Sequence, residues 1–123
     1  MPVQQVFPTL RITDYARSRR FYVEGLGFRI DWENRFDARD PVFMQVTRDG
    51  LSLYLSEHAA DGGVGGLVHL YVPDVDAWHR ELAGRGVEIA LPPRDQAWGN
   101  RDMRILDPDG NQLCVCTPIR RRA

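Results

Sequence analysis

The sequence predicts an α+β protein built from two tandem βαβββ modules, whose strands form a cupped mixed sheet with the helices outside. Three observations support this. Six residues recur in type 60 positions later: Leu10, Asp14, Arg20, Asp49, Gly50 and Leu53 return as Leu70, Asp74, Arg80, Asp109, Gly110 and Leu113. In both copies an Asp precedes a helical pattern, as a helix N-cap does. Both copies also end with an Asp-Gly turn between two strand-like runs. We therefore expect one domain over residues 1–123, made of two repeats at about 5–60 and 66–118.

The first copy is expected to contain a strand, a helix and three more strands, over residues 5–12, 15–24, 28–33, 41–47 and 51–57. Pro8 has no amide proton, so it should lie at an edge or crossing point of the first strand. Asp14 is suited to cap the helix at its start, and Gly25 at its end. The glycine-rich stretch 61–66 reads as a flexible connector between the copies.

The second copy repeats this plan, with strands expected over 67–72, 87–90, 101–107 and 112–117 and a long loop over 91–100. Asp74 should cap a helix that runs to about Ala83. Val75, Trp78 and Leu82 share one helical face, so Trp78 is expected in the core.

Composition limits the possible functions. A net charge of −1 argues against nucleic acid as the main partner. If the three terminal arginines 120–122 are left out, residues 1–119 contain 13 Arg and 17 acidic residues, a net charge of −4. A mildly acidic protein of this kind would suit a cationic ligand. No apolar run is long enough to span a membrane and no leader-like segment is visible. The two cysteines, Cys114 and Cys116, should share one strand face but are poorly placed for a disulfide, which indicates a reduced, cytoplasmic protein.

Several segments together resemble the vicinal oxygen chelate superfamily. They are LRITD at 10–14, FY at 21–22, GLGF at 25–28 and DPDGN at 107–111. This superfamily includes glyoxalase I, extradiol dioxygenases, fosfomycin-resistance transferases and bleomycin-resistance binding proteins. The resemblance covers roughly residues 5–118 and implies the paired-module fold described above.

In the enzymes of that superfamily, His and Glu or Gln side chains on four inward-facing strand positions hold a metal. The resemblance places Phe7, Tyr54, Leu67 and Cys114 at these positions. Phe and Leu carry no donor atom, and a thiol with a phenol is not the oxygen and imidazole set that such metals take. We therefore expect no cofactor and no metal catalysis of the superfamily kind.

Among the branches without a metal, the bleomycin-resistance proteins are the most similar. Their first strand resembles FPTL at 7–10, and the resemblance implies that Pro8 marks where an N-terminal arm crosses to a partner subunit in a homodimer. Their Gln-Pro-Trp-Gly segment is similar to QAWG at 96–99, which implies that Trp98 stacks on the drug. Here His69 stands in place of a pocket aromatic and Cys114 in place of a histidine.

The residues themselves favour binding of a planar molecule. The expected ligand-binding residues are Trp32, Phe43, Tyr54, Ser56, His69 and Trp98. Aromatic faces stack on planar groups and attract cations, and Asp31, Glu33, Asp37 and Asp40 add negative charge. Core packing is the alternative for Trp32, Phe43 and Tyr54, and His69 could equally be a half-buried strand residue.

We expect an antibiotic-sequestering protein that holds a bleomycin-like or other planar drug without chemistry. Two alternatives stay open. One is an enzyme of the same superfamily (glyoxalase, dioxygenase or thiol-transferase type) that uses a relocated metal. The other is a related domain that binds another small molecule in the same cleft.

Overall fold

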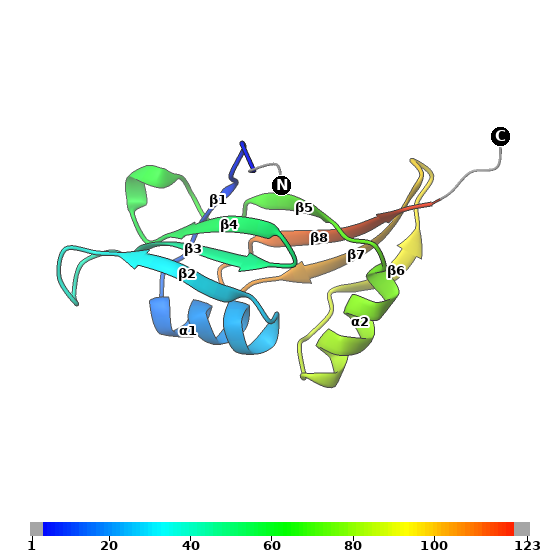
Figure 1. Cartoon of the computed structure of the whole chain (residues 1–123), viewed down its shortest axis with the longest axis horizontal. Helices are drawn as coiled ribbons and strands as arrows, with labels where there is room; N and C mark the ends of the chain where they lie inside the picture. Colours follow the sequence, from blue (N-terminus) through cyan, green and yellow to red (C-terminus); the bar gives the residue numbers. More distant parts are fainter. Residues whose placement is uncertain (1–3, 120–123) are drawn as a thin grey trace. The chain divides into compact units, whose positions relative to one another are not determined.

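The computed structural model describes residues 4–119 and contains two four-stranded sheets, one in each sequence repeat (Figure 1). The chain divides into two compact units. The first comprises the described residues up to Gly66 together with Pro108–Asn111, and the second comprises Leu67–Asp107 and the described residues from Gln112 onward. We call them module 1 and module 2.

Module 1 forms a mixed sheet in the order β1-β4-β3-β2. β1 runs parallel to β4, and the other neighbours are antiparallel. Its elements are β1 (Thr9–Arg11), α1 (Tyr15–Arg19), the π-helix η1 (Arg20–Gly25), β2 (Arg29–Asn34), β3 (Phe43–Arg48), β4 (Leu51–Ser56) and the short 3-10 helix η2 (Ala59–Asp61).

Module 2 repeats the order as β5-β8-β7-β6, again with only the first pair parallel. Its elements are β5 (Leu67–Tyr71), α2 (Val75–Gly84), β6 (Leu91–Asp95), β7 (Asn100–Leu106) and β8 (Gln112–Pro118). The two tandem modules predicted from the sequence are therefore confirmed.

The helix starts show why both copies fold alike. The Asp14 carboxylate accepts a hydrogen bond from the Arg17 amide at 3.1 Å, and the Asp74 carboxylate accepts one from Ala77, also at 3.1 Å. Each side chain satisfies an amide that the first helical turn leaves without a partner. The predicted N-caps are confirmed at both positions.

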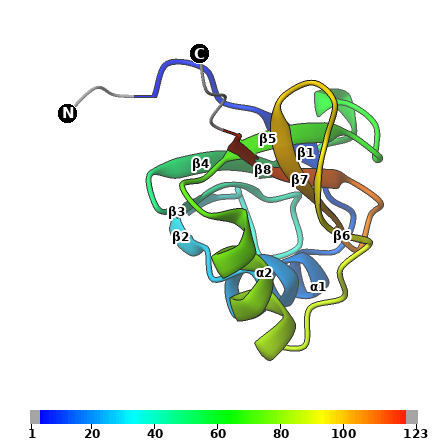
Figure 2. The same cartoon turned by 90° about the vertical axis from the view of Figure 1, so that its right-hand side faces the viewer.

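Helix covers one face of each sheet, and we call the other face the open face (Figures 1 and 2). Some side chains of the open face, such as Cys114 and Cys116, are nevertheless buried. In module 1 the covered face is formed by buried Met44, Val46, Leu53 and Leu55, and in module 2 by Met103, Ile105, Leu113 and Val115. On α2, Val75, Trp78 and Leu82 are all buried, so the predicted core role of Trp78 is confirmed.

Three local predictions were wrong. Residues 87–90 are not a strand; the edge strand β6 lies at Leu91–Asp95, inside the predicted loop. The predicted strand 5–12 is reduced to Thr9–Arg11, since Pro8 has no amide proton to donate. The predicted helix 15–24 is α-helical only to Arg19 and continues as a π-helix. No helix within residues 4–119 combines the length and apolar character needed to cross a membrane.

Candidate functional site

Four aromatic rings gather on the open face of the module 1 sheet. The ring centroids of Phe43 and Tyr54 lie 4.9 Å apart, and Trp32 lies 5.6 Å from Phe43 and 5.8 Å from Tyr54. Phe7 stacks on Tyr54 at 4.8 Å with an interplanar angle of 10°. The register explains the cluster, because Trp32 pairs with Gln45 and Gln45 with Tyr54 across three adjacent strands. We call these four residues the aromatic cluster.

The aromatic cluster is not sealed in the core. Trp32 is 39% exposed, and Phe43, Tyr54 and Phe7 are half-buried. Three of the predicted ligand residues, Trp32, Phe43 and Tyr54, therefore lie together with solvent-accessible ring surface. Rings at these separations and tilts attract one another and present an apolar surface on which a planar molecule can stack.

The carboxylates beside the aromatic cluster are already engaged. Asp31 accepts hydrogen bonds from Thr47 and from Gln45 Nε2 at 2.8 Å, and it pairs with Arg29 at 3.1 Å. Burial opposes its ionisation, but the bonds from Thr47 and Gln45 together with Arg29 lower the pKa of Asp31.

The Glu33 carboxylate accepts a hydrogen bond from the Tyr15 hydroxyl. Burial, followed by the hydrogen bond to Glu33, raises the pKa of Tyr15. Asp37 accepts from the Ala38 amide at 2.6 Å, and Asp40 lies with Phe43 and His58 around a cavity of about 340 Å³. Of these carboxylates, Asp31 forms an ion pair with Arg29, whereas Glu33 and Asp37 accept hydrogen bonds from neutral groups and keep their charge.

Trp98 occupies the connection between β6 and β7 in module 2 and is 67% exposed. The Gln96 amide donates to the Asn100 carbonyl at 2.7 Å, and the Gly99 amide donates to the Gln96 carbonyl at 3.1 Å. Gly99 has φ +98°, a conformation that side-chain-bearing residues rarely adopt. This tight turn places Trp98 at the tip of two paired strands, where its side chain is largely exposed and not part of the core.

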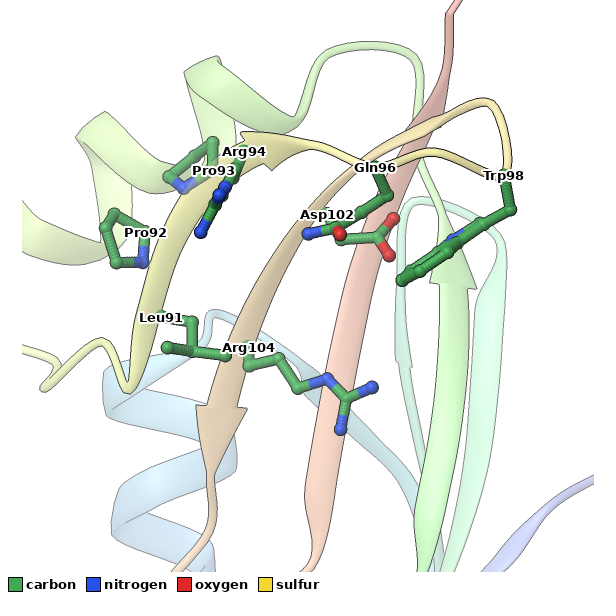
Figure 3. Close-up of a pocket in the computed structure, with 8 residues that line it drawn as sticks. All are labelled: Leu91, Pro92, Pro93, Arg94, Gln96, Trp98, Asp102 and Arg104. Carbon is green, nitrogen blue, oxygen red and sulfur yellow. The ribbon is translucent and has the colours of Figure 1, made fainter.

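Beneath Trp98 lies a cavity of about 530 Å³ (Figure 3). Its lining residues are Leu91, Pro92, Pro93, Arg94, Gln96, Trp98, Asp102 and Arg104. Figure 3 shows the indole turned back from its loop toward the Asp102 carboxylate. The cavity combines apolar surface from prolines and tryptophan with a few charged groups of both signs, which is the usual composition of a small-molecule site.

The other predicted residues have different surroundings. Ser56 is fully buried, and its hydroxyl donates to Asp61 at 2.6 Å and accepts from the His58 amide at 3.1 Å. His69 is exposed on β5, opposite Cys114 in the strand register. The Pro8 carbonyl accepts a hydrogen bond from the Tyr54 amide at 2.9 Å. This bond extends the pairing of β1 with β4 by one backbone hydrogen bond within the same chain.

Cys114 and Cys116 are free, fully buried thiols on the open face of the module 2 sheet. Their sulfur atoms lie 3.5 Å apart, which confirms that they share a strand face. Burial, followed by the contact with Cys114 and the proximity of Asp102, raises the pKa of the Cys116 thiol well above its ordinary value. The Cys116 thiol is therefore not an activated nucleophile.

The four positions that would hold a superfamily metal do not fit one. Phe7 and Leu67 offer only carbon atoms, and the Phe7 ring lies flat against Tyr54, the second position of its module. In module 2, Leu67 is half exposed and Cys114 is buried beside Cys116. These residues do not form the oxygen and imidazole set that a hard divalent ion prefers.

Comparison with known proteins assigns the family. A family model described as glyoxalase superfamily protein matches residues 1–121. The chain belongs to this superfamily. It is 28% identical over 115 residues to the uncharacterized protein YraH of Bacillus subtilis (strain 168), covering 85% of this chain and 90% of YraH.

Two of the similar solved structures are of proteins described as binding an antibiotic. TnmS3, an antibiotic binding protein from Streptomyces sp. CB03234, is 28% identical, with a TM-score of 0.77 over 96% of this chain and 98% of its own. A bleomycin-binding protein in complex with bleomycin is 26% identical, with a TM-score of 0.75 over 93% and 98%. The superfamily resemblance and the fold inferred from the sequence are thus confirmed.

The cavity was missed in the sequence because β6 was not recognised. Leu91, Pro92, Pro93 and Arg94 were assigned to a loop, so their proximity to Asp102 and Arg104 could not be inferred. Two consecutive prolines argue against a central strand, but an edge strand tolerates them. The signal that could have located the strand is the repeat itself, since β2 ends at Asn34 and β6 at Asp95, about one repeat length later.

Proposed function

We propose that this protein binds and sequesters a planar antibiotic of the bleomycin-like kind, without changing any bond in it. The observation that carries the proposal is the exposed indole of Trp98 above a cavity of about 530 Å³. An apolar side chain of this size gains nothing from exposure to water, and a flat ligand stacked on it would remove that surface from solvent. The similarity to two antibiotic-binding proteins supports the same conclusion.

The aromatic cluster is proposed as a second stacking surface. Its rings of Trp32, Phe43 and Tyr54 are held by three neighbouring strands, so little side-chain freedom would be lost when a ligand binds. His69, exposed on β5, is a proposed polar contact. Ser56 is the weakest member of the proposed site, because both of its hydrogen bonds are used within module 1.

We propose that the functional form is a homodimer with two equivalent crevices, and that the arm preceding β1 near Pro8 packs on the partner. Light scattering of the purified protein at micromolar concentration should then give twice the 14.1 kDa mass of the chain. A monomer that binds ligand with full affinity would rule out a crevice shared between subunits.

Stacking rather than charge is expected to provide most of the affinity for a cationic drug. Asp31 already forms an ion pair with Arg29, and Glu33 accepts a hydrogen bond from the Tyr15 hydroxyl, so a bound cation would compete with contacts within the chain. The lining of the Trp98 cavity contains two positive side chains, Arg94 and Arg104, and one negative side chain, Asp102. The dissociation constant should therefore change little between low and high salt.

The decisive variant is Trp98→Ala. We expect it to weaken drug binding by about 1–3 kcal/mol, roughly five- to 150-fold, as for a buried aromatic contact. The unfolding midpoint should not change, because the side chain is 67% exposed in the free protein. Isothermal calorimetry with bleomycin and a panel of planar antibiotics measures the effect.

A matched control is Trp78→Phe, which changes a buried tryptophan of α2 that is not among the residues lining the cavity. This variant should lose stability but retain the affinity for the drug. If Trp98→Ala binds every tight ligand as well as the unaltered protein does, the stacking role of Trp98 is wrong.

A further inference from the structure

Three side chains with metal-binding atoms meet on the open face of the module 2 sheet. The ligand atoms of Asp102, Cys114 and Cys116 all lie within 4.8 Å of one another, and the two sulfur atoms are 3.5 Å apart. The strand register brings them together: Asp102 pairs with Cys116, and Cys114 is two residues earlier on the same strand. We call these three residues the thiol–carboxylate cluster.

The Asp102 carboxylate forms a hydrogen bond with the Cys116 thiol, but one of its two oxygen atoms has no partner among the described residues. Asp102 is only 6% exposed, and within residues 4–119 its Oδ1 atom is one of two buried side-chain polar atoms without a hydrogen bond, the other being Ser18 Oγ in α1. Buried polar atoms are nearly always satisfied, and an unpaired buried carboxylate is costly.

The neighbouring arginines do not compensate this carboxylate oxygen. Arg101 is committed to Asp76 and Asp95, both at 3.0 Å, and Arg104 donates to Gln112 at 2.5 Å. Arg94 lies opposite Asp102 in the register, yet Oδ1 remains unsatisfied. A cation placed between the carboxylate and the two sulfur atoms would supply the missing partner.

Module 1 shows that the fold does not require such a cluster. The strand registers make Phe43, Tyr54 and Ser56 the equivalents of Asp102, Cys114 and Cys116, because Phe43 pairs with Ser56 as Asp102 pairs with Cys116. The module 1 residues are two aromatic rings and a serine whose hydroxyl is already satisfied by Asp61. The same backbone therefore packs well without thiols or a buried carboxylate at these positions.

The spacing of the cluster suits a small tetrahedral ion. Zn²⁺ binds sulfur at about 2.3 Å, which places two ligands of a regular tetrahedron about 3.8 Å apart. The observed sulfur separation of 3.5 Å is within a few tenths of an ångström of this value. Asp102 also lines the cavity of about 530 Å³, so a fourth coordination position can be reached by water or by a ligand (Figure 3).

We propose that Asp102, Cys114 and Cys116 form a binding site for one thiophilic divalent cation, with Zn²⁺ as the physiological occupant. Two sulfur ligands favour such an ion over magnesium or calcium. On binding, each thiol loses its proton to solvent and forms a sulfur–metal bond. Of the four positions that the superfamily resemblance assigns to a catalytic metal, only Cys114 is used. The site shares Asp102 with the cavity proposed for the antibiotic, but metal binding rests on the cluster alone and does not require drug binding.

Titration of the reduced, metal-free protein with Co²⁺ tests this site directly. Thiolate–cobalt bonds give an ultraviolet charge-transfer band, and the chain has two cysteines in all, so any such band must arise from this cluster. We expect a band that saturates at one Co²⁺ per chain and is abolished by one equivalent of Zn²⁺. Absence of the band, or cobalt bound without it through histidines alone, would overturn the proposal.

Two variants separate the carboxylate from other acids. Asp102→Asn should weaken Zn²⁺ binding at least tenfold, whereas Asp95→Asn, which alters an exposed acid on the neighbouring strand, should leave it unchanged. Equal affinity in both variants would remove Asp102 from the site. Should Asp102→Asn fail to fold, the cobalt band of the unaltered protein still decides the question. All measurements are made without drug, so their outcome is separate from that of the antibiotic titration.

Discussion

At the scale of single residues, the side chains with the most chemistry lie on the open faces of the two sheets, Tyr54 in module 1 and Cys114 and Cys116 in module 2. Alternation along a strand was enough to place Tyr54 on the open face and to put Cys114 and Cys116 on one side. It could not show that Asp102 faces the thiols, because that depends on the β7–β8 register. Ser56 faces the predicted side of its strand, but its hydroxyl is already hydrogen-bonded to Asp61. The spacing of residues along the strand gives no sign of this partner, which lies five residues away.

The buried thiol predicts a specific pH dependence of stability. Burial raises the pKa of Cys116, so the folded chain holds this proton more tightly than the unfolded chain does. This contribution to stability is complete below the unfolded thiol pKa of about 8.5 and is lost as the pH rises above it.

Urea unfolding with a chelator present, at a series of pH values from neutral to alkaline, measures the effect. The free energy of unfolding should fall more steeply for the unaltered protein than for Cys116→Ser, which lacks this titrating thiol. Parallel curves for the two proteins would mean that Cys116 does not titrate differently in the folded and unfolded states.

At the scale of elements, caps and turns were predictable because their chemistry is local. Asp14 and Asp74 act as the sequence predicted, and Asp49 and Gly50 both adopt positive φ, +51° and +79°, in the expected hairpin turn. The sequence did not predict the π-helix Arg20–Gly25, because such helices are rare and do not follow the α-helical repeat. It did not predict β6 either, because prolines are uncommon in strands. β6 can contain two prolines because it lies at the edge of its sheet. Which strand lies at the edge becomes known only when the strand order is known.

The N-cap of α2 gives a test at this scale. Asp74→Ala removes the side-chain acceptor for the Ala77 amide and should lower the free energy of unfolding by about 1 kcal/mol. Asp74→Asn keeps an acceptor oxygen and should cost much less. Chemical denaturation followed by circular dichroism compares the two variants, and equal losses would show that the helix does not depend on this hydrogen bond.

At the scale of the whole molecule, duplication explains both what is shared and what differs between the modules. The two sheets have the same strand order and the same covered face, while their open faces carry an aromatic cluster in one module and a thiol–carboxylate cluster in the other. The repeat was visible in the sequence because turns and caps retained their residue types. The divergence of the open faces is where the specific function is expected to lie.

The central claim is that the protein holds a planar antibiotic stoichiometrically and returns it unchanged. The most direct measurement is calorimetric titration with bleomycin and other planar antibiotics, followed by mass spectrometry of the ligand recovered after long incubation. We predict at least one tight ligand, bound at a fixed ratio per chain and recovered with its mass unaltered. Recovery of a chemically modified ligand, or no binding across the panel, would contradict the claim.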